Sequence, residues 1–320
     1  MATALVLTLG SIRGLCFEAA PDYYGPSGVH SMSPALVLRT APLPQSPYLL
    51  GSGRQALDAG YSFVSVWTDP SKTQYFFDFD LAETRLSYRR GIGEGWELGL
   101  SYVDRAFVNN HLDQPTINVH HALGLDQTGR NVYPKNVNQI RIPQYGIDVF
   151  LGHRDISETA ELSLARVLLD GGQDRPQLST SLLLGQPLDH NDLFEGRRGV
   201  DSSVGLQLAW PFARSRLYGN LAWTHFGTDR FLGVPLRVEQ WSGYVGYEHV
   251  LVPKVTWIAD LLVSQGVIDL YQLAEPSYEV HVGVQGTAWD VHWRVMFIEN
   301  IIKYENSPDV GGSVGISKLW

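Results

Sequence analysis

The sequence has little cysteine, little lysine and no long apolar run. Its one cysteine, Cys16, lies close to the N-terminus, so the rest of the chain can form neither a disulfide nor a thiolate metal site. No stretch approaches the roughly 18 consecutive apolar residues of a membrane-spanning helix. The 24 lysines and arginines are outnumbered by 33 acidic residues, and the resulting net charge of -9 argues against a nucleic-acid partner.

Alternation of apolar and polar residues dominates the chain from Gln55 onward. In the segment 96–102 (WELGLSY), Leu98 and Leu100 alternate with Glu97 and Gly99. This period of two predicts strands with one apolar and one polar face. About a dozen segments follow the pattern, although some residues break it, such as Val64 and Val66, and the segment 139–152 follows it only weakly.

Two architectures produce such alternation, a soluble β-sandwich and a membrane β-barrel. The apolar faces carry aromatic residues near strand ends, and the polar faces carry charged residues beside glycine, while lysine occurs only at 72, 135, 254, 303 and 318. These features favour an all-β fold, a transmembrane antiparallel β-barrel of about 12 strands of the outer-membrane type. We expect the barrel to span 55–320 and residues 21–54 to form a periplasmic or plug-like segment. A secreted soluble β-sandwich binding module is the alternative.

The two ends of the chain carry further signals. Residues 1–20 read as a signal peptide, because an apolar run is followed by Ala19 and Ala20, although the usual positive start is missing. Lipidation of Cys16 is less favoured, since Arg13-Gly14-Leu15 is a poor lipobox. In the last expected strand, Val310, Val314, Ile316 and Trp320 lie on one face, and the chain ends on the aromatic Trp320. We interpret this terminal aromatic residue as an assembly signal for a barrel assembly machinery.

One insertion, 107–138, interrupts the strand pattern. Asp113 followed by Pro115 predicts the start of a short helix, and Gly124 can end it. We expect Ile117, His121 and Leu123 to pack into or across the barrel mouth as a plug, followed by a polar loop that contains Arg130. The neighbouring His120 and His121 could with Asp113 form a metal site or an acid–base pair, but adjacent helical residues point about 100° apart. We therefore favour packing and expect neither metal nor cofactor.

The densest charge group on a polar face consists of Glu83, Arg85, Arg89 and Glu97. It predicts either a charged pore lining or a structural ladder that fills a narrow lumen. If the hairpin turns around Ile92, Ser87 lies opposite Glu97.

Several short motifs resemble a bacterial family known as domain of unknown function 3187, from about Pro34 onward. The matching residues are Glu83, Gly91-Ile92 before 96–99 (WELG), Leu112-Asp113, His120 or His121, Gly124-Leu125, Arg130, Phe297, Glu299 and Pro308-Asp309. The chain departs from the pattern at Asn300 and Lys318. The resemblance implies an outer-membrane barrel without a known chemistry.

A porin-like channel or a structural envelope protein in the bacterial outer membrane is the leading hypothesis. Its expected partners are outer-membrane lipid and, during biogenesis, the barrel assembly machinery. We do not expect an enzyme. The alternative is an outer-membrane acyl hydrolase that uses His281 or His292 with Ser264 or Ser277, although no short motif links a nucleophile to either histidine.

Overall fold

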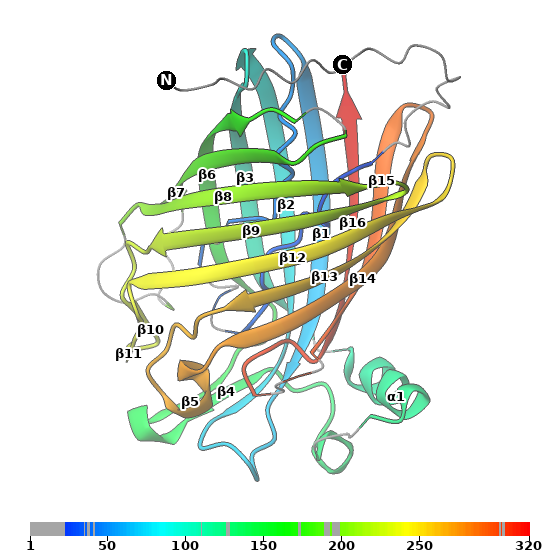
Figure 1. Ribbon diagram of the computed structural model, residues 1–320. Helices are drawn as coiled ribbons and strands as arrows, with labels where there is room; N and C mark the ends of the chain where they lie inside the picture. Colours follow the sequence, from blue (N-terminus) through cyan, green and yellow to red (C-terminus); the bar gives the residue numbers. More distant parts are fainter. Residues whose placement is uncertain are drawn as a thin grey trace, which may run out of the picture.

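The structure is a computed structural model (Figure 1). It describes residues 23–320 except 35, 37, 38, 41, 110, 126–128, 172–173, 189–192, 194–198, 301 and 303–304. The expected signal peptide, 1–20, and Cys16 lie outside these residues. Within them, no helix has both the length and the apolar character of a membrane span.

Twelve strands of the described chain form one closed antiparallel barrel (Figure 1). The strands are β1 (Gln55–Trp67), β2 (Phe76–Gly93), β3 (Trp96–Val108), β6 (Arg154–Leu169), β7 (Gln177–Pro187), β8 (Asp201–Phe212), β9 (Ser215–His225), β12 (Glu239–Val252), β13 (Val255–Ser264), β14 (Ser277–Ala288), β15 (Val291–Glu299) and β16 (Val310–Leu319). Strand β1 pairs with both β2 and β16, and this double pairing closes the barrel. The β-sandwich alternative is therefore wrong.

The weakly alternating segment 139–152 is not a barrel strand. It forms the short strands β4 (Gln139–Ile142) and β5 (Ile147–Phe150), joined by the 3-10 turn η2 (Pro143–Tyr145). Strand β4 pairs with the first residues of β2, so this hairpin extends the sheet beyond the barrel. A second small ribbon, β10 (Arg230–Phe231) with β11 (Val234–Pro235), lies in the loop between β9 and β12.

The two ends of the barrel differ in their connections. At the end we call the turn end, tight hairpins such as 94–95, 213–214, 253–254 and 289–290 join the strands, and the C-terminus lies there too. At the opposite end, the loop end, the connections are long. They include the insertion with the predicted helix, α1 (Asp113–Leu123), the 3-10 turn η1 (Arg130–Val132) and, before β14, η3 (Tyr271–Ala274) (Figure 1).

The outer face of the barrel is apolar and the inner face is polar. Leu100 is 57% exposed and its neighbour Leu98 is 40% exposed, whereas Glu97 is buried inside the barrel. The same holds around the wall, where exposed outward residues include Leu57, Leu86, Leu182, Val204, Leu221, Val245, Val295 and Ile316. A continuous apolar belt of this kind is foreign to the surface of a soluble monomer.

Near the loop end the inner face becomes apolar as well. Val64 and Val66, which break the alternation of β1, are fully buried in a cluster with Phe79 and other inward side chains. The cluster also contains Met32 and Leu36 from the N-terminal segment. These exceptions to the sequence pattern therefore mark where the barrel wall packs against chain inside the lumen.

Candidate functional site

The lumen is occupied by the described residues of the range 23–50, which we call the lumen segment. It begins at the turn end, where the Tyr24 hydroxyl donates to the Lys254 carbonyl at 2.9 Å. It reaches the loop end, where the Ser33 hydroxyl donates to the Asn306 carbonyl at 2.9 Å. It then returns to the turn end, where Leu50 contacts β3 before β1 begins. The segment thus passes through the barrel twice.

The composition of the lumen segment explains why it does not join the sheet. Five prolines at 26, 34, 42, 44 and 47 lack the amide hydrogen that a strand ladder needs. The segment has no acidic residue and one arginine, Arg39, whose guanidinium donates to the carbonyl of Arg237 at 2.6 Å and lies over the Phe226 ring at 3.9 Å. Its other hydrogen bonds to the wall come from uncharged or imidazole side chains, such as Tyr24, His30 and Ser33, and from its backbone amides.

Carboxylates of the wall accept hydrogen bonds from backbone amides of the lumen segment. Glu248 accepts from the amides of Tyr24 and Gly25, at N–O distances of 2.9 and 3.2 Å. Glu279 accepts from the amides of Met32 (2.8 Å) and Ser33 (3.1 Å). Asp201 accepts from the amide of Thr40 (3.3 Å), and Glu97 accepts from that of Leu50 (2.8 Å). Hydrogen bonds to a charged acceptor are each worth about 1.5–3 kcal/mol, more than neutral ones. The acidic wall therefore holds an uncharged stretch of backbone.

One arginine contacts both passes of the segment. The Arg216 guanidinium on β9 lies 4.1 Å from the ring centre of Tyr23 and 4.5 Å from that of Tyr48. Each cation–π contact is worth about 0.5–2 kcal/mol, depending on how far it is desolvated. Arg216 thereby fastens the start and the end of the segment at the turn end.

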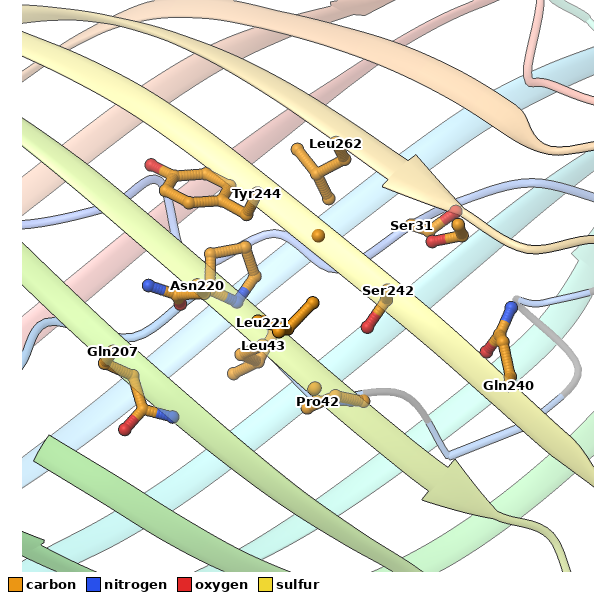
Figure 2. Close-up of a pocket in the computed structure, with 14 residues that line it drawn as sticks. Ser31, Pro42, Leu43, Gln207, Asn220, Leu221, Gln240, Ser242, Tyr244 and Leu262 are labelled. Atoms are coloured by element: carbon orange, nitrogen blue, oxygen red, sulfur yellow. The ribbon is translucent and has the colours of Figure 1, made fainter.

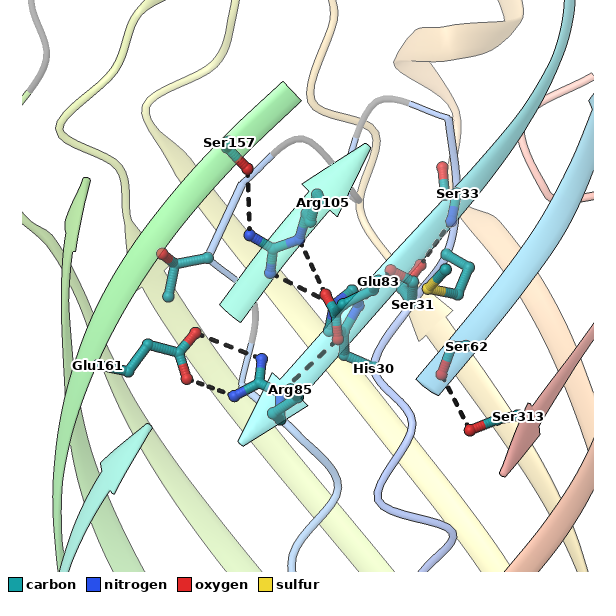
Figure 3. A network of polar contacts seen from close by, with 12 residues as sticks. His30, Ser31, Ser33, Ser62, Glu83, Arg85, Arg105, Ser157, Glu161 and Ser313 are labelled. Carbon is teal, nitrogen blue, oxygen red and sulfur yellow. Dashed lines mark hydrogen bonds and ion pairs between the residues drawn. The ribbon is translucent and has the colours of Figure 1, made fainter. Parts of the chain in front are cut away.

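The predicted charge group forms a buried network at mid-barrel (Figure 3). Glu83 accepts hydrogen bonds from Arg105 Nε at 2.8 Å and from His30 of the lumen segment, and Arg85 Nε lies 3.6 Å from it. Arg85 also pairs with Glu161. Arg105 was not predicted from the sequence. It lies an even number of residues from Glu97 on β3, so the strand pattern already places its side chain on the inner face.

Arg89 and Glu97 form the second part of the predicted group, nearer the turn end. Arg89 pairs with Asp58 at 3.1 Å and with Glu97 at 3.3 Å. The expected pairing of Ser87 with Glu97 is wrong, because the chain turns at Gly95 with a bulge beyond Gly91 rather than around Ile92. Glu97 therefore faces Gly91. All four predicted charged residues face the lumen and are ion-paired there.

A small cavity remains between the returning pass and the wall (Figure 2). Pro42 and Leu43 line it on one side, and Asn220, Tyr244 and Leu262 line it on the other. Its volume is about 30 Å³. A cavity of this size has room for a few water molecules.

The insertion packs on the mouth at the loop end with a different helix face from the expected one. We expected Ile117, His121 and Leu123 to pack inward, but His121 and Leu123 are exposed and Ile117 is only partly buried. The buried face is that of Asp113, Thr116 and His120, whereas Leu123 is 60% exposed. The polar face packs on the mouth because Asp113 pairs with Arg130 and His120 lies beside Glu299 and Asp309.

Arg130 connects the insertion to the barrel. Its guanidinium pairs with Asp113 of the helix at 2.8 Å and with Asp309, just before β16, at 2.5 Å. It also donates to Ser65 on β1. Burial raises the pKa of the Asp309 carboxyl, and Arg130 opposes this rise.

His120 lies beside the same carboxylates. Its Nε2 is 3.4 Å from Asp309 and 3.7 Å from Glu299, while His121 on the same helix is exposed. Burial lowers the pKa of His120, but the two carboxylates raise it more, so its pKa lies above the ordinary value. Because only one of the two histidines is buried, the pair does not converge with Asp113 on one point.

The residues of the hydrolase alternative do not meet. Ser264 pairs with Ser277 at the loop end of β13 and β14. His292 pairs with Thr287 near the turn end, about 30 Å along β14 from Ser277, and its ring stacks on Tyr24 at 4.6 Å. His281 is buried 3.6 Å from Glu279, and among the described residues neither of its ring nitrogens has a hydrogen-bond partner.

Trp320 directly follows β16, the strand that completes the barrel wall. The Trp320 amide donates to the Gln55 carbonyl at 3.1 Å, and its own carbonyl accepts from the Gln55 amide at 2.9 Å. Its side chain is about half exposed at the turn end. The role of Trp320 in assembly stays a prediction.

A comparison with protein families identifies the chain. The family described as "Protein of unknown function (DUF3187)" matches residues 15–320. The chain belongs to this family. No curated protein matches the sequence.

Solved structures with a similar fold are outer-membrane barrels. The COG4313 outer membrane channel from Pseudomonas putida F1 is 10% identical with a TM-score of 0.53, over 87% of this chain and 99% of that chain. Two other barrels are more distant in structure. The KdgM porin is 8% identical with a TM-score of 0.43, over 82% of this chain and 98% of that chain. The translocator domain of autotransporter NalP from Neisseria meningitidis is 10% identical with a TM-score of 0.44, over 84% of this chain and 89% of that chain. At 10% identity the likeness to the first of these structures concerns the fold alone, and it agrees with the predicted closed antiparallel β-barrel.

Proposed function

We propose that this protein is a porin-like channel of the bacterial outer membrane whose lumen is closed at rest by residues 23–50. The observation that carries the proposal is the way this segment is held. Wall carboxylates bind its backbone amides, so no covalent bond or strand pairing has to break when it leaves. Displacement would leave a lumen whose wall carries many acids and arginines, and water can fill its polar part.

The proposal also assigns an orientation and partners. Outer-membrane barrels have short periplasmic turns and longer extracellular loops, so the turn end faces the periplasm and α1 faces outward. The apolar belt contacts outer-membrane lipid, and the strand ending at Trp320 is presented to the barrel assembly machinery.

The filled lumen also favours a second function, a structural envelope barrel that never opens. In that case the ion-paired network around Glu83 serves stability alone. We do not propose the acyl hydrolase, since its candidate serines and histidines lie apart.

Weakening the carboxylate contacts tests the channel directly. The double variant Glu248→Gln and Glu279→Gln replaces charged acceptors by neutral ones, which costs about 1 kcal/mol for each residue and favours release by about 30-fold in total. We expect brief openings in planar bilayers that are about 30-fold more frequent than in the wild type.

Glu94→Gln is the matched control for this experiment. Glu94 is an exposed acid at the β2–β3 turn, and its substitution should leave the current unchanged. If the double variant is as silent as the Glu94→Gln control, these carboxylates do not control opening and the structural function is favoured.

Membrane insertion is tested by electrophoresis. A transmembrane barrel stays folded in mild detergent until it is boiled, because every strand is paired with its neighbours. We expect a band that changes mobility on boiling and a protein that fractionates with outer membranes. Release by washing the cells, without a mobility change, would contradict the proposed location.

A further inference from the structure

Three buried side chains meet at the loop-end mouth, outside the lumen segment. They are His120 of α1, Glu299 at the end of β15 and Asp309 before β16, with exposed fractions of 3%, 5% and 3%. The Nε2 atom of His120 lies 3.4 Å from Asp309 Oδ1 and 3.7 Å from Glu299 Oε1. One atom from each side chain that could bind a metal, an imidazole nitrogen or a carboxylate oxygen, lies within 4.8 Å of the corresponding atoms of the other two.

His120 lies at ion-pair distance from both carboxylates, but neither contact has the geometry of a hydrogen bond. In the described part of the chain, neither ring nitrogen of His120 has a hydrogen-bond partner, and Glu299 Oε2 has none. The two distances from Nε2 exceed the roughly 3.2 Å of an N–H···O hydrogen bond. Unpartnered polar atoms at this depth are rare and costly, which indicates that something else satisfies them.

The spacing matches a metal ion rather than a direct hydrogen bond. In a tetrahedral site with bonds of about 2.0–2.2 Å, the ligand atoms lie about 3.3–3.6 Å apart. The two distances from His120 Nε2 are 3.4 and 3.7 Å. Asp309 Oδ2 is fixed by Arg130 at 2.5 Å, which leaves Oδ1 to face the histidine, and ligand carboxylates are typically oriented in this way.

The charge of the surroundings also calls for a cation. Arg130 interacts with Asp78, Asp80, Asp113 and Asp309, and all four carboxylates are buried. Glu299 adds a fifth buried carboxylate at this end of the barrel. A divalent ion would offset part of this negative charge.

We propose that His120, Glu299 and Asp309 bind one divalent transition-metal ion, with Zn²⁺ as the best match. Zn²⁺ accepts imidazole nitrogen together with carboxylate oxygen, whereas Ca²⁺ and Mg²⁺ favour oxygen alone. The ion links the insertion to the last two strands and so fixes α1 on the mouth. This set differs from the metal site that we disfavoured in the sequence, because Glu299 and Asp309 replace His121 and Asp113.

The test is zinc binding by the full-length protein, folded in detergent without a histidine tag and stripped with a chelator. We expect one Zn²⁺ per chain by calorimetry and by metal analysis after desalting. His120→Ala should weaken binding by about 10–100-fold or more. The matched control is His121→Ala, which removes the exposed neighbour on the same helix and should bind like the wild type.

Glu299→Gln provides a second variant in case His120→Ala does not fold, as judged by its mobility on gels without boiling. It keeps the shape of the side chain and should weaken Zn²⁺ binding as well. Cobalt adds a structural readout, since Co²⁺ bound in place of Zn²⁺ should show the visible absorption of a low-coordinate site. A wild type that binds no Zn²⁺ would overturn the proposal and leave a proton as the occupant. An equal loss of Zn²⁺ affinity in His120→Ala and His121→Ala would overturn the proposal too.

Discussion

A chain that lacks residues 23–50 should conduct ions across a planar bilayer, while the full-length chain stays almost silent. In the closed state, the returning pass leaves a cavity of about 30 Å³ beside the wall, which is too small for a hydrated ion. Without the segment, the lumen of a twelve-stranded barrel is wider than that of eight-stranded barrels, which side chains alone can fill. We therefore expect a steady current from the shortened chain and only rare openings from the full-length chain.

The deleted barrel should still fold, because strand pairing closes the wall without help from the lumen segment. Heat modifiability of the variant verifies this. Addition of a synthetic peptide with the sequence 23–50 from the turn-end side should block the current again. A folded variant that stays silent would instead support the structural function.

The barrel itself could be predicted from the sequence because each strand meets two different solvents. The apolar belt and the polar lumen force a period of two, and the segment 96–102 shows this directly. The same rule failed at Val64 and Val66, which point inward and are apolar. Their inner neighbour is the lumen segment rather than water, and local alternation does not reveal such a partner.

The site was much harder to predict than the wall. The lumen segment has no periodicity, and its contacts join residues that are far apart in the sequence, such as Gly25 with Glu248 and Ser33 with Asn306. The inward face of α1 was predicted from apolarity, but the mouth offers charged partners instead. Asp113 pairs with Arg130 and His120 lies beside Glu299 and Asp309, so these two residues face inward. Glu83, Arg85, Arg89 and Glu97 could be identified because strand parity alone places them in the lumen.

Leu182→Arg should prevent stable insertion into lipid, whereas Leu123→Arg should be nearly neutral. Leu182 lies at the middle of β7, between Leu164 and Val204 on the neighbouring strands, and is 41% exposed on the outer face. An arginine at the midplane of a lipid-facing barrel wall costs about 2–4 kcal/mol. The folded fraction in lipid vesicles, measured by urea titration and gel mobility, should fall accordingly.

Leu123 is the matched control because it is also an exposed leucine but lies on α1 at the loop end. Arginine there meets water, and surface substitutions of this kind stay within about 0.5 kcal/mol. In a barrel surrounded by water, both substitutions would be surface changes with equally small effects. A difference of about 2 kcal/mol or more between them therefore identifies the outer belt as the lipid-facing surface, and equal stability of the two variants would refute a transmembrane barrel.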